Sequence, residues 1–338
     1  MQLSIIIVNW NSAQYARDCV ASIRRLTRNL SYEILVVDNA STDNSAEALS
    51  EIPDIHLICS RVNLGFAGAN NLGFTRSQGD AVLFLNPDTL LLSPAINQMY
   101  EYLELQPAVG AVGCCQLNAD LTFQTASVHA FPTIANQVAD NDWLRRIAPR
   151  ARLWGRNAPV TDGGFRAVEV EAVSGACLMA RRAMLNQVGG FSTDYFMYGD
   201  DIDLCYRIAA HGWKIRHLSD ARIVHYGGKS SEQAAENCFA DVLTRESVRT
   251  FFFNTRGPAY AFAYRISMGV SSLLRLALLG PAYLASPSQH RKAMLARARR
   301  WIRVWRWAVG LERWTRALPR TAAGSAESCP SILPDASS

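Results

Sequence analysis

The chain has 338 residues, of which 49% are hydrophobic and 19% charged, and its formal net charge is +5. This length suits one large domain with an appendage, and it excludes a string of many small modules. The eight cysteines are scattered without CxxC spacing, so we expect no disulfide framework and a reducing compartment.

Short apolar runs alternate with helix-length amphipathic segments in the first half of the chain, at residues 3–8, 33–37, 55–59 and 81–85. This alternation predicts βαβ units and an α/β fold with a mostly parallel sheet flanked by helices. Ligands of open α/β sheets bind at the carboxyl ends of the strands, so polar residues there should converge in one crevice. The polar residues that follow these strands are Asn9, Asn11, Asp38, Asn39, Asn63, Asn86 and Asp88.

Asp38 stands at the tip of a buried strand, where a carboxylate can accept the imide N–H of a uracil or thymine ring. Alternatively, Asp38 and Ser41 cap the next helix, and the residues alone do not decide between the two. We assign Asn39 and Asp43 to structural roles. Residues 63–73 contain three glycines and three asparagines, which would let a backbone approach a nucleotide or would serve tight helix packing.

Two positions could bind a divalent metal. Asp88 follows an apolar strand and Pro87, and a metal that bridges two phosphates needs only one or two protein carboxylates. An ordinary Asn-Pro-Asp turn is the alternative. His225 ends a further predicted strand, and a lone histidine is more often structural than a ligand.

The acidic cluster Asp200, Asp201 and Asp203 opens the predicted helix at residues 200–210. Three carboxylates in four positions repel one another, which raises a pKa toward that of a general base or is relieved by a metal or a hydroxyl nucleophile. Simple capping of the helix is the alternative. Residues 168–180 are predicted to form a strand pair, and residues 114–166 an irregular insertion that shapes an acceptor site.

Five motifs, in this order, resemble the inverting GT-A glycosyltransferases of family 2, especially the bacterial rhamnosyltransferase-like branch. They are VNWN at 8–11, VVDNAS at 36–41, NLGFAGANN at 63–71, NPD at 86–88, and GGF…YGDDIDLCYR at 189–207. The resemblance covers residues 3–230. It implies a GT-A fold, a nucleotide-sugar donor and a divalent cofactor, Mn²⁺ or Mg²⁺.

The resemblance also implies a role for each matching residue. Asp201 would be the general base, with Asp200, which stands where the family commonly has Glu, as the second candidate. Asp88 and His225 would bind the metal, although Asn86 replaces the first Asp of the family's DXD element. The nucleotide-sugar site would contain Asn9, Asn11, Asp38, Asn63, Gly65, Phe66, Asn70 and Asn86.

The implied reaction moves L-rhamnose from dTDP-rhamnose to a hydroxyl of a lipid-linked cell-surface glycan. Alternatives are a hexosyl or galactofuranosyl transferase that uses a UDP-sugar, and a catalytically silent scaffold that binds nucleotide sugar within a polysaccharide assembly complex. The expected location is cytoplasmic, at the inner face of the cell membrane.

The positive charge is concentrated near the C-terminal end. Residues 1–248 contain 20 basic and 26 acidic residues, whereas residues 249–320 contain 14 basic residues and one acidic residue. The apolar segment 259–284 is interrupted by Arg265, Arg275 and Pro281, which favours a helix in the membrane plane over a spanning one.

Residues 291–316 combine nine basic residues with four tryptophans, as in a helix held at an anionic membrane surface. A solvated helix packed on the core through its tryptophans is the alternative, and no nucleic-acid motif is present. We therefore expect a glycosyltransferase domain at 1–248, a basic membrane-associating helical region at 249–318, and a disordered tail at 319–338.

Overall fold

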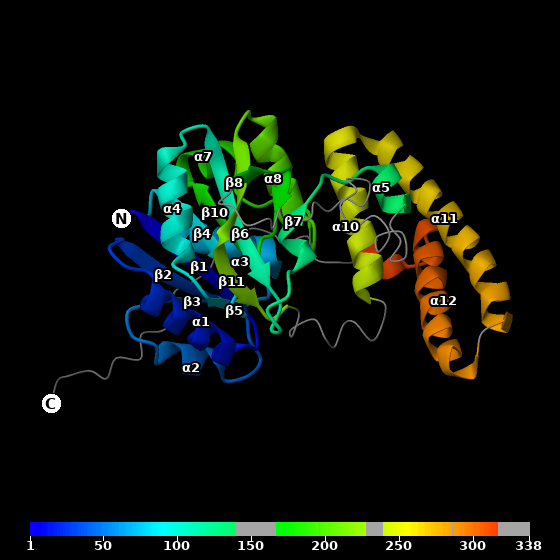
Figure 1. Cartoon of the computed structure of the whole chain (residues 1–338), viewed down its shortest axis with the longest axis horizontal. Helices are drawn as coiled ribbons and strands as arrows, with labels where there is room; N and C mark the ends of the chain where they lie inside the picture. The colour runs from blue at the N-terminus through cyan, green and yellow to red at the C-terminus, as the bar shows by residue number, and fades with distance from the viewer. Residues whose placement is uncertain (140–166, 196, 228–238, 286, 317–338) are drawn as a thin grey trace.

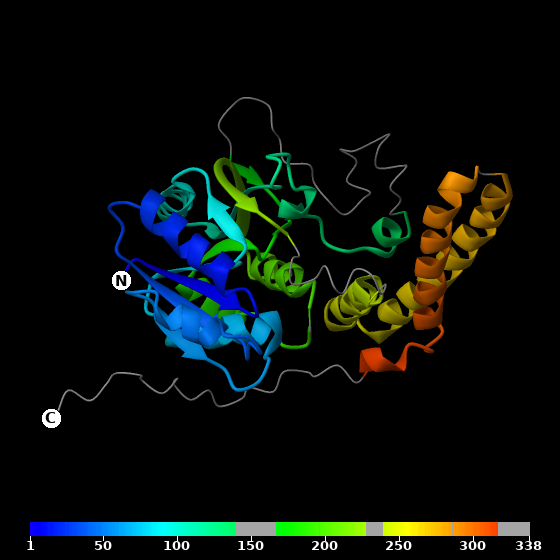
Figure 2. The same ribbon diagram turned by 90° about the horizontal axis from the view of Figure 1, so that it is seen from below.

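The computed structural model describes residues 1–139, 167–195, 197–227, 239–285 and 287–316. The predicted disordered tail and most of the predicted insertion lie outside these residues. Within the described part, a mixed α/β body carries a group of long helices at one end (Figures 1 and 2).

A central sheet of nine strands has the order β3-β2-β1-β4-β10-β6-β11-β5, with β8 beside β11. β1 pairs in parallel with β2 and β4, and β2 with β3, which confirms the predicted parallel half. A small second sheet joins β7 and β9. The strands are β1 (Leu3–Asn9), β2 (Tyr32–Asp38), β3 (His56–Cys59), β4 (Ala81–Leu85), β5 (Thr89–Leu91), β6 (Val109–Leu117), β7 (Val128–His129), β8 (Ala167–Glu169), β9 (Ala172–Val173), β10 (Cys177–Arg181) and β11 (Lys214–His225).

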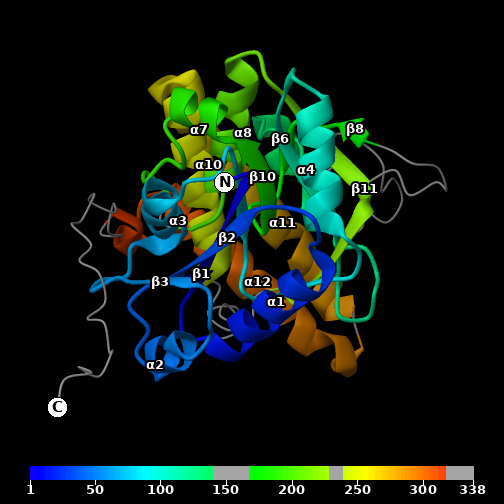
Figure 3. The ribbon, with the colours of Figure 1, turned by 90° about the vertical axis from the view of Figure 1, so that its left-hand side faces the viewer.

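Helices cover both faces of the sheet (Figure 3). Along β1, Ile5 and Ile7 join one apolar cluster while Ile6 joins the other, because alternate side chains of a strand point to opposite faces. Burial on both faces explains why these strands are apolar throughout. The helices of this body are α1 (Ala13–Leu26), α2 (Ser45–Ser50), α3 (Gly65–Arg76), α4 (Ala95–Leu105), η1 (Thr125–Ser127), α5 (Ile134–Ala139), α7 (Arg182–Val188) and α8 (Asp200–Ala210).

Two expectations about the middle of the chain need correction. The predicted strand pair at 168–180 is three short strands, and none pairs with another: β8 pairs with β11, β9 with β7, and β10 with β4 and β6. The start of the predicted insertion is regular, since β6 extends to Leu117 and α5 covers Ile134–Ala139. These strands are defined by pairing with strands far away in the sequence, and local periodicity does not reveal such pairing.

Three long helices and one short one form the C-terminal part: α10 (Phe239–Arg256), α11 (Pro258–Ala285), α12 (Ser288–Ala308) and η3 (Arg313–Arg316). The boundary expected after residue 248 falls inside α10. A third apolar cluster joins these helices to α5 and α8, with Phe251, Phe252, Tyr264 and Trp307 buried in it.

The apolar segment 259–284 and the basic segment 291–316 each show a feature that the sequence did not predict. α11 continues through Pro281 without a break, and residues Pro258–Leu284 are long and apolar enough to cross a membrane by length and composition alone. The indole of Trp307 is 2% exposed and donates to Glu246 Oε2 at 2.8 Å. Trp307 therefore packs in the protein and is not available as a lipid anchor.

Candidate active site

The carboxyl ends of β1 and β2 meet through side chains, because Asn9 and Asp38 stand opposite each other in the parallel register. Asn9 Nδ2 and the Ser41 hydroxyl donate to Asp38 Oδ1 at 2.9 and 2.6 Å, and the Ser41 N–H donates to Oδ2 at 3.2 Å. Asp38 is buried at 3% exposure. The carboxylate thus organises the loop that follows β2.

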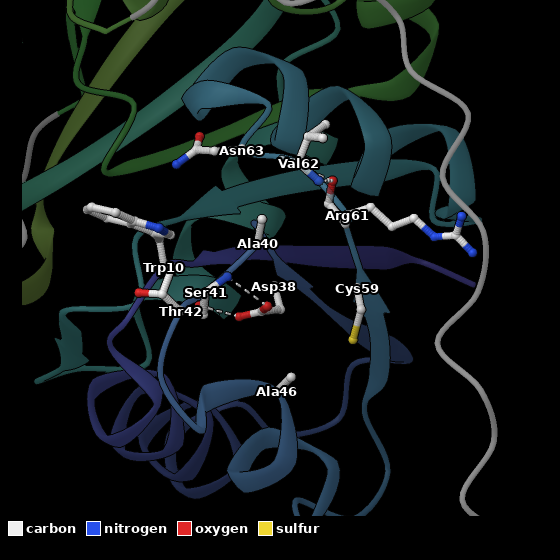
Figure 4. Close-up of a pocket in the computed structure, with 11 residues that line it drawn as sticks. Trp10, Asp38, Ala40, Ser41, Thr42, Ala46, Cys59, Arg61, Val62 and Asn63 are labelled. Carbon is white, nitrogen blue, oxygen red and sulfur yellow. Dashed lines mark hydrogen bonds between the residues drawn. The ribbon is translucent and has the colours of Figure 1, made fainter.

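Asp38 also lines an open pocket of 790 Å³ at these strand ends. Figure 4 shows Trp10, Asp38 and Asn63 around the same opening, each at or just after the end of a different strand. The pocket is large enough for part of a nucleotide. Trp10, with 41% of its surface exposed, offers an aromatic ring there. Sequence reasoning missed Trp10, because a single aromatic residue after a strand carries no distinctive pattern.

Asn11, Asn39 and Asn63 tie the loops of this pocket together. Asn11 Oδ1 accepts the Thr42 N–H at 2.8 Å, which joins the loops after β1 and β2. Asn39 accepts the Leu64 N–H at 2.8 Å and donates to Asn63 Oδ1 at 3.1 Å. Asn63 lines the pocket, whereas Asn39 has the structural role expected of it.

The start of α3 contains the remaining predicted nucleotide-sugar residues. Gly65 has a φ of 67°, a conformation that favours glycine. Phe66 packs edge-on against Phe191 with ring centroids 5.5 Å apart. Asn70 is 2% exposed and donates to the Phe66 carbonyl at 3.0 Å, so its side chain serves the helix itself. None of these three lines the pocket next to Asp38.

Asp88, Asn86 and His225 converge at the ends of β4 and β11. His225 Nε2 lies 3.3 Å from Asp88 Oδ1 and 3.2 Å from Asn86 Nδ2. The Tyr226 N–H donates to the Asp88 carbonyl at 3.0 Å, which holds the two segments together. Residues far apart in the sequence thus form one compact polar group.

Gln124, which sequence reasoning missed, fixes the His225 ring. Gln124 Nε2 donates to the His225 carbonyl at 2.9 Å, so Gln124 Oε1 faces His225 Nδ1 at 2.8 Å. In this arrangement Nδ1 donates to Gln124, and in the neutral ring Nε2 is then the nitrogen that carries a lone pair and faces Asp88 and Asn86. Gln124 lies in a stretch without periodicity, and no sequence signal marks it.

A carboxylate beside a neutral imidazole nitrogen is a ligand pair that fits a divalent metal such as Mn²⁺. Asp88 and His225 are each 14% exposed at the side chain, so the pair is reachable. Among the described residues, no three His, Cys, Asp or Glu side chains are grouped to hold a metal. Donor phosphates and water would therefore have to supply the other ligands.

Asp201 lies next to this group through a short turn. Asp201 Oδ2 accepts the Gly175 N–H at 2.9 Å, and the neighbouring Ala176 carbonyl accepts the Asn86 N–H at 2.9 Å. The turn between β9 and β10 thereby places the start of α8 against the end of β4. Asp201 remains partly exposed.

Asp200 and Asp203 differ from Asp201 in their surroundings. Burial, and then the nearby Asp201 charge, raise the pKa of Asp200 to about 8, and among the described residues its Oδ2 has no hydrogen-bond partner. Asp203 accepts from the Tyr195 hydroxyl at 3.0 Å and from Arg207 Nε at 2.7 Å. At neutral pH, Asp200 is therefore mainly protonated, and Asp203 has a structural role.

The overall fold is that of the GT-A glycosyltransferases. The mannosyltransferase PcManGT from Pyrobaculum calidifontis, solved in complex with GDP-Man and Mn²⁺, matches with a TM-score of 0.56 at 18% identity. The match covers 92% of this chain and 86% of that one.

The chain belongs to glycosyl transferase family 2, whose family model matches residues 4–176. It is 26% identical over 248 residues to N-acetylglucosaminyl-diphospho-decaprenol L-rhamnosyltransferase of Mycobacterium tuberculosis, covering 68% of this chain and 77% of the relative. It is 23% identical over 234 residues to rhamnosyltransferase WbbL of Escherichia coli (strain K12), covering 66% and 82%. The protein is thus a family 2 glycosyltransferase that is similar to rhamnosyltransferases.

Proposed function

We propose that the enzyme transfers L-rhamnose from dTDP-rhamnose to a hydroxyl of a lipid-linked glycan, with inversion at the anomeric carbon. The observation that carries this proposal is the position of Asp201, one turn away from the group formed by Asn86, Asp88 and His225. A base and a diphosphate site are then adjacent, as direct displacement requires. The names of the mycobacterial and Escherichia coli relatives support the sugar and the class of acceptor.

In this mechanism the donor base enters the pocket beside Asp38, and Trp10 and Asn63 flank it. Asn9 and Asn11 keep the loops of that pocket in place, while Gly65, Phe66 and Asn70 shape the start of α3 outside the pocket. Asp88 and His225 would hold a divalent metal, and Asn86 Nδ2 lies beside the same histidine nitrogen. Such an ion would supply positive charge that neutralises the leaving diphosphate.

Asp201 takes the proton from the acceptor hydroxyl as that oxygen attacks the anomeric carbon. One base suffices because inversion needs no covalent intermediate. We assign the base to Asp201 because it is partly exposed, whereas Asp200 is buried and mainly protonated at neutral pH. Asp200 supports the start of α8, where its Oδ1 accepts the Asp201 N–H at 3.2 Å.

The test is a donor panel with Mn²⁺ or Mg²⁺ and a lipid-linked saccharide acceptor, in which release of dTDP or UDP is followed. The panel contains dTDP-rhamnose and the UDP forms of glucose, galactose and galactofuranose. We expect dTDP release from dTDP-rhamnose, and a loss of about 10²–10⁴ in turnover for Asp201→Asn.

Asp54→Asn, the same change at an exposed loop position, is the matched control and should keep full turnover. If only UDP is released, the transferred sugar is a hexose or galactofuranose and not rhamnose. Full turnover by Asp201→Asn would remove Asp201 from its role as base. No turnover with any donor would favour the silent scaffold.

A further inference from the structure

α11 has a protein-facing side and an outward-facing side. Tyr264, Met268 and Ser272 are buried against the neighbouring helices. On the opposite side, exposed apolar side chains recur every three or four residues, which is the spacing of one helix face. These side chains, here called the outer stripe, are Phe262, Ile266, Val270, Leu273, Leu274 and Leu278.

The two arginines of α11 do not lie on the outer stripe. Arg265 donates from Nη2 to the Trp307 carbonyl at 2.7 Å, and its guanidinium lies 5.6 Å from the Trp307 ring. Arg275 donates from Nη2 to the Val138 carbonyl at 2.8 Å and lies 4.3 Å from the Trp301 ring. The charges that interrupt the apolar run in the sequence thus point into the protein.

α12 lies antiparallel beside α11, as Figure 1 shows. Arg275 contacts Trp301, and Arg291 lies 5.4 Å from the Tyr283 ring. The first half of α12 therefore runs along the second half of α11. Its exposed cations are Arg291, Lys292, Arg297 and Arg299.

Three further cations of α12 form ion pairs with acids. Arg300 lies 2.7 Å from Asp241, while Arg303 and Arg306 lie 3.4 and 3.1 Å from Glu312. The exposed cations from Arg291 to Arg299 thus lie beside the second half of α11.

We propose that the outer stripe of α11 lies in the plane of an anionic lipid bilayer, in the acyl region of one leaflet, with the exposed cations of α12 at the head groups. A helix that is apolar on one side, beside a basic segment, binds a membrane by burial and charge together. This proposal rests on the proposed function, whose lipid-linked acceptor requires a membrane nearby. The contact itself needs no donor, metal or acceptor.

Two other arrangements fit less well. A spanning α11 would have to leave α10 and α12 and bring Arg265 and Arg275 into lipid, at a large cost in free energy. A second copy of the chain would meet the stripe with the same excess of charge, because residues 258–308 contain nine basic residues and no acidic residue. Like charges would then repel across the contact.

The test is flotation of the full chain with vesicles of phosphatidylglycerol and phosphatidylcholine, and with vesicles of phosphatidylcholine alone. The double variant Val270→Asp/Leu274→Asp adds two charges to the outer stripe. We expect the wild-type chain to bind the anionic vesicles, and the variant to bind at least about tenfold more weakly, which is 1.4 kcal/mol. Lys292→Gln/Arg299→Gln should weaken binding to anionic vesicles only.

The matched control Leu105→Asp/Leu121→Asp adds the same charges at exposed apolar positions of the α/β body and should bind like the wild type. Circular dichroism confirms that each variant is folded. Equal flotation of wild type and stripe variant, or no flotation of the wild type, would overturn the proposal. So would a wild-type dimer in size-exclusion chromatography that the stripe variant dissociates. Donor turnover is measured separately, so failure of the proposed reaction is distinguishable from failure of membrane binding.

Discussion

At the scale of single residues, Gln124 bonds Nδ1 of His225 and so determines that Nε2 is the ring nitrogen that faces Asp88. Gln124 bonds both Nδ1 and the carbonyl of His225. Hydrogen-bond partners that orient a metal-binding histidine typically raise metal affinity by about 10–100-fold. We predict that Gln124→Ala weakens Mn²⁺ binding about tenfold or more, measured by titration calorimetry with dTDP present.

Gln98→Ala is the control, because Gln98 lies on α4 and, among the described residues, its side chain bonds only Ser93. Its Mn²⁺ affinity should equal that of the wild type. An unchanged affinity in Gln124→Ala would mean that the ring of His225 is held by other contacts or does not bind the metal.

Asp200 makes the stability of the fold depend on pH. Its pKa rises from 3.8 to about 8, so across this interval the folded chain keeps a proton that the unfolded chain releases. The resulting stability is complete below pH 3.8 and is lost as the pH rises through 8. We predict that Asp200→Asn, which cannot ionise, melts increasingly above the wild type between about pH 5 and pH 9.

Differential scanning calorimetry across that range measures the difference, and Asp54→Asn is the exposed control. A constant difference in melting temperature between Asp200→Asn and wild type would show that the carboxyl of Asp200 titrates normally.

The sequence predicted the convergence of side chains at the strand ends better than their partners. Asn9 with Asp38 follows from a parallel sheet whose carboxyl ends share an edge, whereas Asp88 with His225 followed from the family resemblance. Trp10 and Gln124 do not follow, because their contribution depends on where irregular loops place them. Asn70 was assigned to the nucleotide-sugar site, but its amide is used inside α3.

At the scale of elements, β1 to β4 were predictable because each is a single short apolar run. The helix α8 was predictable because its apolar residues have helical spacing. The strands at 167–181 were not, since each is short and pairs with a partner far away in the sequence. Asn71 shows a similar long-range link: its amide group exchanges two hydrogen bonds with the backbone of Phe191 and fixes the turn before α8 on α3.

The C-terminal helices show where composition alone misleads. Arginine and tryptophan side by side suggested lipid anchoring, yet Trp301 and Trp307 pack against α11 arginines inside the protein. The exposed apolar surface belongs to α11, whose arginines had argued against a spanning helix and for one in the membrane plane. Direction around each helix, which composition ignores, separates the exposed apolar side chains of α11 from the exposed cations of α12.

At the scale of the whole molecule, the cluster around Trp307 joins the helices to the transferase body. Ile202 and Tyr206 of α8 pack on this cluster, and the Tyr206 ring lies 5.3 Å from that of Phe251. The helix that begins with Asp200 and Asp201 thus shares a core with α10, α11 and α12. We expect the two parts to unfold together.

Trp307→Ala tests this coupling. Removing a buried indole typically lowers the free energy of unfolding by about 3–5 kcal/mol. Here the substitution also removes the hydrogen bond that the indole donates to Glu246. We predict a single unfolding transition whose midpoint lies at a lower urea concentration than that of the wild type, because the free energy of unfolding falls by that amount. Donor turnover should be lost at urea concentrations where the wild type is still active. Trp10→Ala, at an exposed indole, should leave the transition in place. Two separate transitions, of which only the less stable one moves, would mean instead that the body folds without the helices and that α8 does not depend on their core.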